Sequence, residues 1–195
     1  MIVKFKSLIL SAVLAVFISV PAFADFTVDK SHTSVGFITK HFMTRVRGHF
    51  DVHTVEFKFD EKNPEKSMAR FVAKAASVNT ENPDRDKMLR SDNFFDIEKF
   101  PEISFQSTRV IPLGDNKYRL EGDLTIKGIK KTVSLEVEYL GSIIDQSKVT
   151  HMGFEIHGKV NRKDFGIVRN KLLDNGGVMI PDDVGIDIQV EATQK

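Results

Sequence analysis

The sequence predicts an all-β protein whose antiparallel strands form a closed barrel, and three features of the chain predict it. Apolar residues recur at every second position from Phe26 onward, which is typical of strands with one buried and one wet face. Turn-forming residues separate these alternating segments. The buried faces combine 16 Phe and no Trp with glycines and alanines. Such an interior leaves space, whereas the two faces of a sandwich interdigitate, so the barrel is favoured.

About eight strands are predicted from the alternating segments. Their inward-facing sets are, in chain order, Val35 and Phe37; Val46, Gly48, Phe50 and Val52; Val55, Phe57 and Phe59; Phe71, Ala73 and Ala75; Ile103 and Phe105; Tyr118, Leu120, Gly122, Leu124 and Ile126; Val133, Leu135, Val137 and Tyr139; Met152, Phe154, Ile156, Gly158 and Val160; Val184, Ile186, Ile188 and Val190. Turns are predicted at Lys62–Pro64, Gly114–Asn116, Lys127–Gly128 and Asn175–Gly177. The stretch Lys163–Pro181 is predicted as a long loop at one barrel mouth.

One long interruption, Pro83–Ser107, separates the strand-like segments. Pro83 suits a first helical turn, and the acidic residues that follow it suit the positive end of that turn. The spacing predicts a short helix over Pro83–Arg90, followed by Phe94 and Phe95, which must be buried. A helix of this kind set against a sheet indicates a plug or lid over a cavity.

The N-terminus has the pattern of a secretory signal. Two lysines precede the apolar run Leu8–Val20, which is too short to span a membrane, and Ala22-Phe23-Ala24 forms a small-x-small cleavage site. We therefore expect residues 1–24 to be removed on export and residues 25–195 to form a single β-barrel domain. The chain has no cysteine, so the core must supply its stability without disulfides.

The charge balance argues against nucleic-acid binding. Removing the two lysines of the signal from the 28 basic residues leaves 26, against 27 acidic residues, a formal net charge of −1. Nucleic-acid-binding domains normally carry a basic excess. We therefore expect no nucleic-acid partner.

Two groups of residues that contain histidine are candidate chemical sites. His49, Asp51 and His53 alternate along one strand, and neighbours on one face lie about 7 Å apart, which suits a single ion poorly. We expect them to be solvated and predict no metal. His32 and His41 bracket the first strand, but the chain has no G-x-S-x-G elbow, so no catalytic residue is predicted.

The charged residues of the predicted helix allow two interpretations. Arg85 and Arg90 lie among Asp84, Asp86 and Asp92, and local ion pairs of this kind contribute only tenths of a kcal/mol. Alternatively, an arginine contacts the anionic or polar head group of a ligand at the barrel entrance. Spacing alone favours the local ion pairs over the contact with a head group.

Five blocks of the chain, in order, resemble the YceI family, the periplasmic polyisoprenoid-binding, lipocalin-like proteins. They are Asp29–Phe37 with His41, Val46–Phe50, Arg85–Asp96 with Phe100-Pro101 and Phe105, Gly122–Gly128, and Asn161–Gly166. The family usually has histidine where this chain has Met88, and often aspartate where it has Asn93. If that histidine contacts the head group, this chain is expected to prefer a different or less polar one.

The resemblance implies an extended eight-stranded antiparallel lipocalin-like barrel whose tunnel holds an isoprenoid, quinone-like or polyprenyl amphiphile as ligand, with no other cofactor and no catalytic residue. The residues expected to line the tunnel are Val35, Phe37, Phe50, Phe57, Phe94, Phe105, Leu124, Phe154 and Phe165. Those expected at the mouth, near the head group, are His32, His41, Arg85, Asp86 and Met88. A one-residue error in register would remove a whole set from the interior.

The resulting hypothesis is a non-catalytic protein that binds, stores or transports such a lipid. Two alternatives stay open: an enzyme acting on an isoprenoid or amide lipid through His32, His41 and Arg85, and a stress-response interaction module with a vestigial pocket. Because a mouth rich in Phe and Met can be covered by another surface, a homodimer and a transient membrane contact are also carried as hypotheses.

Overall fold

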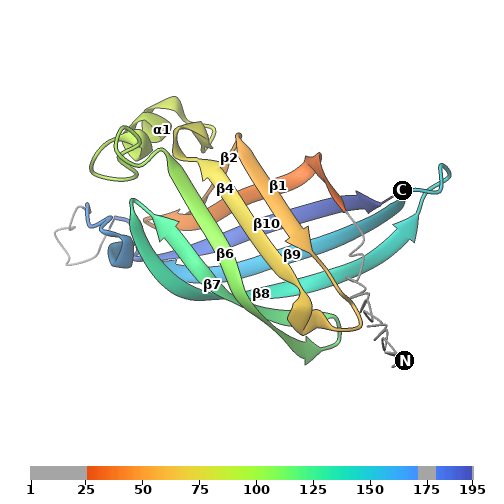
Figure 1. Ribbon diagram of the computed structural model, residues 1–195. Coiled ribbons are helices and arrows are strands. Elements are labelled where there is room, and N and C mark those ends of the chain that lie inside the picture. The colour runs from red at the N-terminus through yellow and green to blue at the C-terminus, as the bar shows by residue number, and fades with distance from the viewer. Residues whose placement is uncertain (1–25, 171–178, 195) are drawn as a thin grey trace, which may run out of the picture.

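The computed structural model describes residues 26–170 and 179–194, which form one strongly curled antiparallel sheet with a few short helices (Figure 1). The strands are β1 (Thr27–His41), β2 (Thr44–Phe50), β3 (His53–Lys58), β4 (Met68–Lys74), β5 (Val78–Asn79), β6 (Glu102–Gly114), β7 (Lys117–Ile126), β8 (Ile129–Ile144), β9 (Thr150–Asn161) and β10 (Asp183–Gln194). The helices are α1 (Pro83–Arg90) and the 3-10 turns η1 (Pro64–Lys66), η2 (Ala75–Ser77) and η3 (Arg162–Phe165). The all-β class and the helix over Pro83–Arg90 are confirmed.

The sheet order is β3-β4-β6-β7-β8-β9-β10-β1-β2-β5, and every paired neighbour runs antiparallel. The chain itself connects the two sides of this order. β3, at one end, follows β2, which lies next to the other end, after only Asp51 and Val52. There the backbones approach closely: Lys74 N donates to Val52 O at 2.9 Å, and Asp51 N donates to Ser77 O at 3.0 Å. The sheet is thereby curled into a half-barrel.

The predicted strand number was wrong, since the described residues form ten strands rather than eight. The sequence pattern cannot reveal β5, because two residues are too few to show an alternation. The break between β2 and β3 also reverses the expected facing of Val52, which is 56% exposed. β2 and β3 lie on the two sides of the bend, and each must point its apolar face inward. The alternation therefore cannot continue unbroken from β2 into β3.

The interior is filled by apolar residues from all the long strands. Val35, Phe105 and Leu124 are each about 2% exposed, and Leu135 is 1% exposed. The rings of Phe71 and Phe105 stack at a centroid distance of 5.8 Å. This packing gives the fold its stability without disulfides, since burying each such side chain contributes roughly 1.5–3 kcal/mol.

The inward-facing glycines do not leave empty space, which corrects the reason given for favouring a barrel. A Cβ on Gly48 would clash with the ring of Phe37, and one on Gly122 would lie 2.5 Å from both Gln106 O and Phe105 Cζ. A Cβ on Gly158 would likewise clash with Leu135. The glycines therefore give room to large side chains of the neighbouring strands.

The helix α1 lies at one end of the barrel, and the C-terminus lies at the other (Figure 1). Pro83 occupies its first turn, and the side chain of Asn82 caps it by accepting from Arg85 N at 3.0 Å. None of the described helices is long and apolar enough to cross a membrane. The predicted signal, residues 1–24, and the predicted turn at Asn175–Gly177 lie outside the described residues.

Candidate functional site

An apolar cavity lies inside the barrel, toward the end opposite α1. Its volume is about 100 Å³, against the roughly 10–15 Å³ that one water needs. Its apolar wall includes Val55, Phe57, Phe59, Ala69, Phe71, Phe105, Val110, Tyr118, Leu120, Leu135, Val137, Phe154, Ile156, Ile188 and Val190. Aromatic rings meet edge-on here: Phe59 lies 5.2 Å from Phe154 and 5.8 Å from Tyr118 between centroids. Burial, assisted by Glu61, raises the pKa of Tyr118, so its hydroxyl stays neutral.

A second, wider pocket opens at the end that carries α1, with a volume of about 1040 Å³ by the same measure. Its apolar wall includes Phe37, Val46, Met88, Leu89, Phe94, Ile167, Val168, Met179, Ile180 and Val184. Its charged wall contains five cations and two carboxylates, namely Lys40, Arg85, Lys127, Arg162 and Arg169 with Asp84 and Asp92. A predominantly cationic wall favours a ligand group that is anionic or accepts hydrogen bonds.

The two pockets follow one another along the inner wall of the barrel. On β10, the residues Val184, Ile186, Ile188 and Val190 share one face because they alternate with outward-facing ones. Val184 lines the wide pocket, and Ile188 and Val190 line the apolar cavity. The step from Val184 to Ile188 spans roughly 13 Å of strand. A single inward residue, Ile186, therefore lies between the two pockets on this strand.

Phenylalanine rings surround this partition. Phe37 pairs with Ile186 across β1 and β10, and its ring lies 5.9 Å from that of Phe50. The ring of Phe50 in turn lies 5.9 Å from that of Phe95, which follows α1. A buried layer of rings therefore connects the helix to the centre of the barrel.

The charged groups of α1 hold the helix on the sheet. Arg85 donates from Nε to Thr80 Oγ1 and from a terminal nitrogen to Thr80 O, both at 2.8 Å. Asp86, which is 7% exposed, accepts from Thr80 N at 2.9 Å and from Thr80 Oγ1 at 2.5 Å. Arg90 donates to Ala76 O at 2.7 Å and to Val78 O at 2.8 Å. These arginines therefore bind backbone and hydroxyl groups of the segment before the helix, and neither of the two interpretations of the charge cluster anticipated that.

Arg162 organises the other side of the wide pocket. Its side chain is 4% exposed and donates to the carbonyl oxygens of Ile167, Arg169 and Pro181, and to Asp182 Oδ1 at 2.9 Å. Lys163 Nζ lies 2.7 Å from Asp182 Oδ2. This contact, together with the nearby Arg162 guanidinium, lowers the pKa of the Asp182 carboxyl. The described part of the predicted loop thus lies at one pocket, as expected of a mouth.

The structure divides the predicted tunnel residues between the two pockets. Phe57, Phe105 and Phe154 line the apolar cavity, and Phe37 and Phe94 line the wide pocket. Four others are buried and line neither of these two pockets: Val35, Phe50, Leu124 and Phe165. Of the predicted mouth residues, His41, Arg85 and Met88 line the wide pocket. Asp86, the fourth residue of α1, is buried against Thr80.

His32 is not brought to this mouth. It lies nine positions before His41 in β1, which corresponds to roughly 30 Å of extended chain. Its side chain is 66% exposed and contacts Asp29 on the surface. The side chains of His49 and Asp51 are also partly exposed. The imidazole of His49 lies 3.0 Å from Asp51 Oδ1.

Several wall residues were not named as site candidates from the sequence. Leu120, Leu135, Ile156 and Ile188 line the apolar cavity and belong to inward-facing sets that alternation did predict. The signal was present, but it marks the whole interior and does not separate cavity wall from filled core. Arg162 has no such signal, because a buried arginine is an exception to the usual exposure of that residue type.

The fold and its pockets define a lipocalin-like protein, in which a single curled antiparallel sheet surrounds an apolar interior. The YceI-like domain matches residues 26–192, and the chain belongs to this family. It is 36% identical over 171 residues to a UPF0312 protein of Staphylococcus aureus (strain N315), covering 86% of this chain and 96% of that one.

Solved structures show the same fold. The crystal structure of the Campylobacter jejuni YCEI protein is 33% identical, has a TM-score of 0.69 and covers 88% of this chain and 98% of its own. A polyisoprenoid binding domain from Saccharophagus degradans, implicated in plant cell wall breakdown, is 14% identical with a TM-score of 0.58, covering 88% and 99%. At that identity the likeness concerns the fold alone.

Proposed function

We propose that this protein binds a long apolar molecule with a polar head, of the isoprenoid class, and carries or stores it without chemical change. The observation that carries the proposal is the succession of two pockets along one wall: a cationic one at α1 and an apolar one farther along the barrel. An amphiphile has the matching succession of a polar head and an apolar tail.

The tail is expected to dominate affinity. Each buried methylene contributes roughly 0.8 kcal/mol, so about ten contribute on the order of 8 kcal/mol before ordering costs. A hydrogen bond to the head contributes about 0.5–1.5 kcal/mol net. A tail that reaches the apolar cavity must pass the layer of Phe37, Phe50 and Ile186. Rotation of the two phenylalanine rings is the step that admits the tail.

The head group is expected in the wide pocket. Lys40 and Arg169 are the cations there that we assign to its recognition, since Arg85, Arg162 and Lys127 donate to oxygens of the protein itself. Met88 and Asn93 line the same pocket. A thioether in place of an imidazole offers no strong donor, which supports a head group less polar than the one the family's usual histidine suits.

The comparisons support this proposal at the level of the fold, because one of the similar structures is described as a polyisoprenoid binding domain. The enzyme alternative is less well supported. Its candidate residues are dispersed, with His32 on the outer surface while His41 and Arg85 line the wide pocket.

We further propose that the protein is exported to the periplasm and contacts a membrane with the end that carries the wide pocket. Phe42 and Met43, in the turn between β1 and β2, are 46% and 90% exposed, and Phe42 N donates to the pocket residue Met179 at 3.0 Å. Lys40 and Arg45 flank this turn. Exposed apolar side chains next to cations suit an anionic lipid surface.

The test is lipid analysis of the protein exported with its own signal segment. Native mass spectrometry followed by solvent extraction should find one bound species in the isoprenoid mass range. Ala69→Phe adds a ring to the wall of the apolar cavity and should lower the bound lipid at least tenfold. Ser134→Phe adds the same ring on the exposed side of β8 and should leave lipid content unchanged.

An empty protein that also fails to take up added geranylgeraniol would overturn the proposal. Equal lipid content in Ala69→Phe and the parent would remove the apolar cavity from it. The intact mass of the exported protein tests the signal at the same time, since cleavage after Ala24 leaves Asp25 as the first residue.

A further inference from the structure

The first strand is interrupted on the outer surface, at the end of the barrel away from α1. The β1–β10 register breaks between Asp29 and Ser34, so the intervening residues bulge out of the ladder. The hydroxyl of Thr33 closes the gap: it accepts from Glu191 N at 3.2 Å and faces Glu191 O at 3.4 Å. The bulge is therefore anchored to one residue of β10, and that residue is Glu191.

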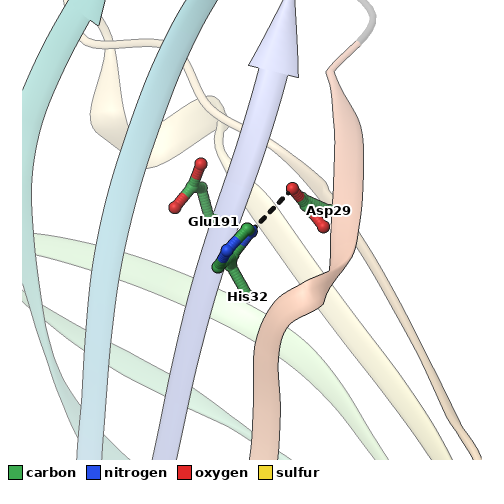
Figure 2. A group of neighbouring side chains, drawn as sticks. All are labelled: Asp29, His32 and Glu191. Carbon is green, nitrogen blue, oxygen red and sulfur yellow. Dashed lines mark hydrogen bonds and ion pairs between the residues drawn. The ribbon is translucent and has the colours of Figure 1, made fainter.

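The bulge gathers three potential metal ligands. Asp29, the last paired residue before the bulge, and His32, inside it, lie with Glu191 of β10 so that one ligand atom of each falls within 4.8 Å of the others (Figure 2). The imidazole Nδ1 of His32 lies 2.9 Å from Asp29 Oδ2. In a regular strand, residues three apart point to opposite faces, so only the bulge places Asp29 and His32 together.

The electrostatics of this group favour a cation. Asp29 and Glu191 are directly opposite in the antiparallel register, and like charges in that position are unfavourable. His32 lies beside Asp29, and His151 lies beside Glu191. Asp145 adds a third carboxylate, 3.3 Å from His151 Nε2. The cluster thus concentrates negative charge that two imidazoles only partly offset.

We propose that Asp29, His32 and Glu191 form a binding site for a divalent transition-metal ion of the zinc type. Imidazole nitrogen with carboxylate oxygens is a ligand set that such ions accept. With metal–ligand distances of about 2.0–2.1 Å, tetrahedral ligand atoms lie about 3.3 Å apart. Small rotations achieve this, because the three side chains are between 30% and 66% exposed.

His151 acts as a positioning residue in this site. Its Nδ1 lies 2.9 Å from Glu191 Oε1, and Asp145 holds its other nitrogen. A hydrogen bond to a ligating carboxylate orients it toward the metal. Because the site joins the start of β1 to β10 on the outside of the barrel, it is separate from the lipid cavity, and zinc binding is expected whether or not lipid is bound.

The experiment is calorimetric titration of ZnCl2 into the chelator-stripped protein. We expect one equivalent to bind and the unfolding temperature to rise with zinc concentration, as required of a ligand that binds only the native state. His32→Ala should weaken binding at least tenfold, and Glu191→Gln should do the same. His151→Ala should weaken it less and leave the stoichiometry at one.

The matched control is His157→Ala. His157 also lies between two carboxylates, 3.5 Å from Glu155 of its own strand β9 and 3.4 Å from Asp187 of β10, but the β9–β10 ladder has no bulge. Its loss should leave zinc affinity unchanged. The proposal is overturned if zinc does not bind, or if His157→Ala weakens binding as much as His32→Ala does. Because His32 is exposed, the metal-free variant should unfold at the parent's temperature, which is measured in the same series.

Discussion

At the scale of single residues, the interior is shaped by pairs of a glycine and a large neighbour. Phe37 lies over Gly48, its direct partner across β1 and β2, and Leu135 lies over Gly158 in the same way across β8 and β9. The ring or isobutyl group occupies the volume that a side chain at the glycine would need. Substituting either member of a pair therefore disturbs the other.

Gly122→Ala is predicted to be destabilising. Its Cβ would lie 2.5 Å from the backbone oxygen of Gln106 and from Phe105 Cζ, and backbone cannot move aside as cheaply as a side-chain end. We expect a loss of about 1–3 kcal/mol in the free energy of unfolding, measured by urea denaturation. Gly153→Ala is the control, since its Cβ meets only side-chain atoms of Leu140, the nearest at 3.3 Å. Equal stability of both variants would contradict this account of the interior.

At the scale of elements, α1 is attached to the barrel chiefly by polar contacts of its arginines. Arg90 reaches back to Ala76 O and Val78 O, and Arg85 reaches Thr80. The helix also carries few apolar residues. Its position over the wide pocket therefore depends on these hydrogen bonds more than on burial.

Arg90→Met is predicted to loosen α1 while the barrel persists. The substitution keeps the apolar stem but removes both donors, and charge-assisted hydrogen bonds contribute about 1.5–3 kcal/mol each before discounting for solvent. Hydrogen exchange should speed up over residues 75–97 and stay unchanged in β7 to β9. Lys87→Met, on an exposed position of the same helix, should change neither. Faster exchange in the barrel strands as well would show that the helix and the barrel unfold together.

At the scale of the whole molecule, the two ends of the barrel differ in character. The α1 end combines the wide pocket, its cations and the exposed turn of Phe42 and Met43. The other end carries Ile143 and Ile144 at the close of β8, each 72% exposed. Both ends expose apolar side chains, so exposure alone does not decide which end would meet a membrane under the proposal.

Met43→Ser is predicted to reduce binding to vesicles that contain anionic phosphatidylglycerol several-fold, as measured by co-sedimentation. Ile143→Ser removes a comparably exposed apolar side chain from the opposite end and should leave co-sedimentation unchanged. Sedimentation velocity without vesicles tests the homodimer. A dimer that Met43→Ser dissociates, with vesicle binding absent in the parent, would mean that a second copy covers this end.

The sequence by itself determined the all-β class, the helix over Pro83–Arg90 and the inward faces of the long strands. These follow from local rules: alternation places Phe105 and Leu124 inside, and Pro83 suits a first helical turn. A regular period is a property of consecutive residues, so no tertiary contact is needed to see it.

Only the tertiary structure decided where the breaks in that pattern fall and what they bring together. The bend at Asp51–Val52 separates β2 from β3, and the bulge in β1 places Asp29 beside His32 and Glu191. The tertiary structure also shows that Arg85 and Asp86 both hydrogen-bond with Thr80, which spacing could not reveal. Such features depend on register between distant strands, because residues such as Asp29 and Glu191 meet only when the sheet has formed.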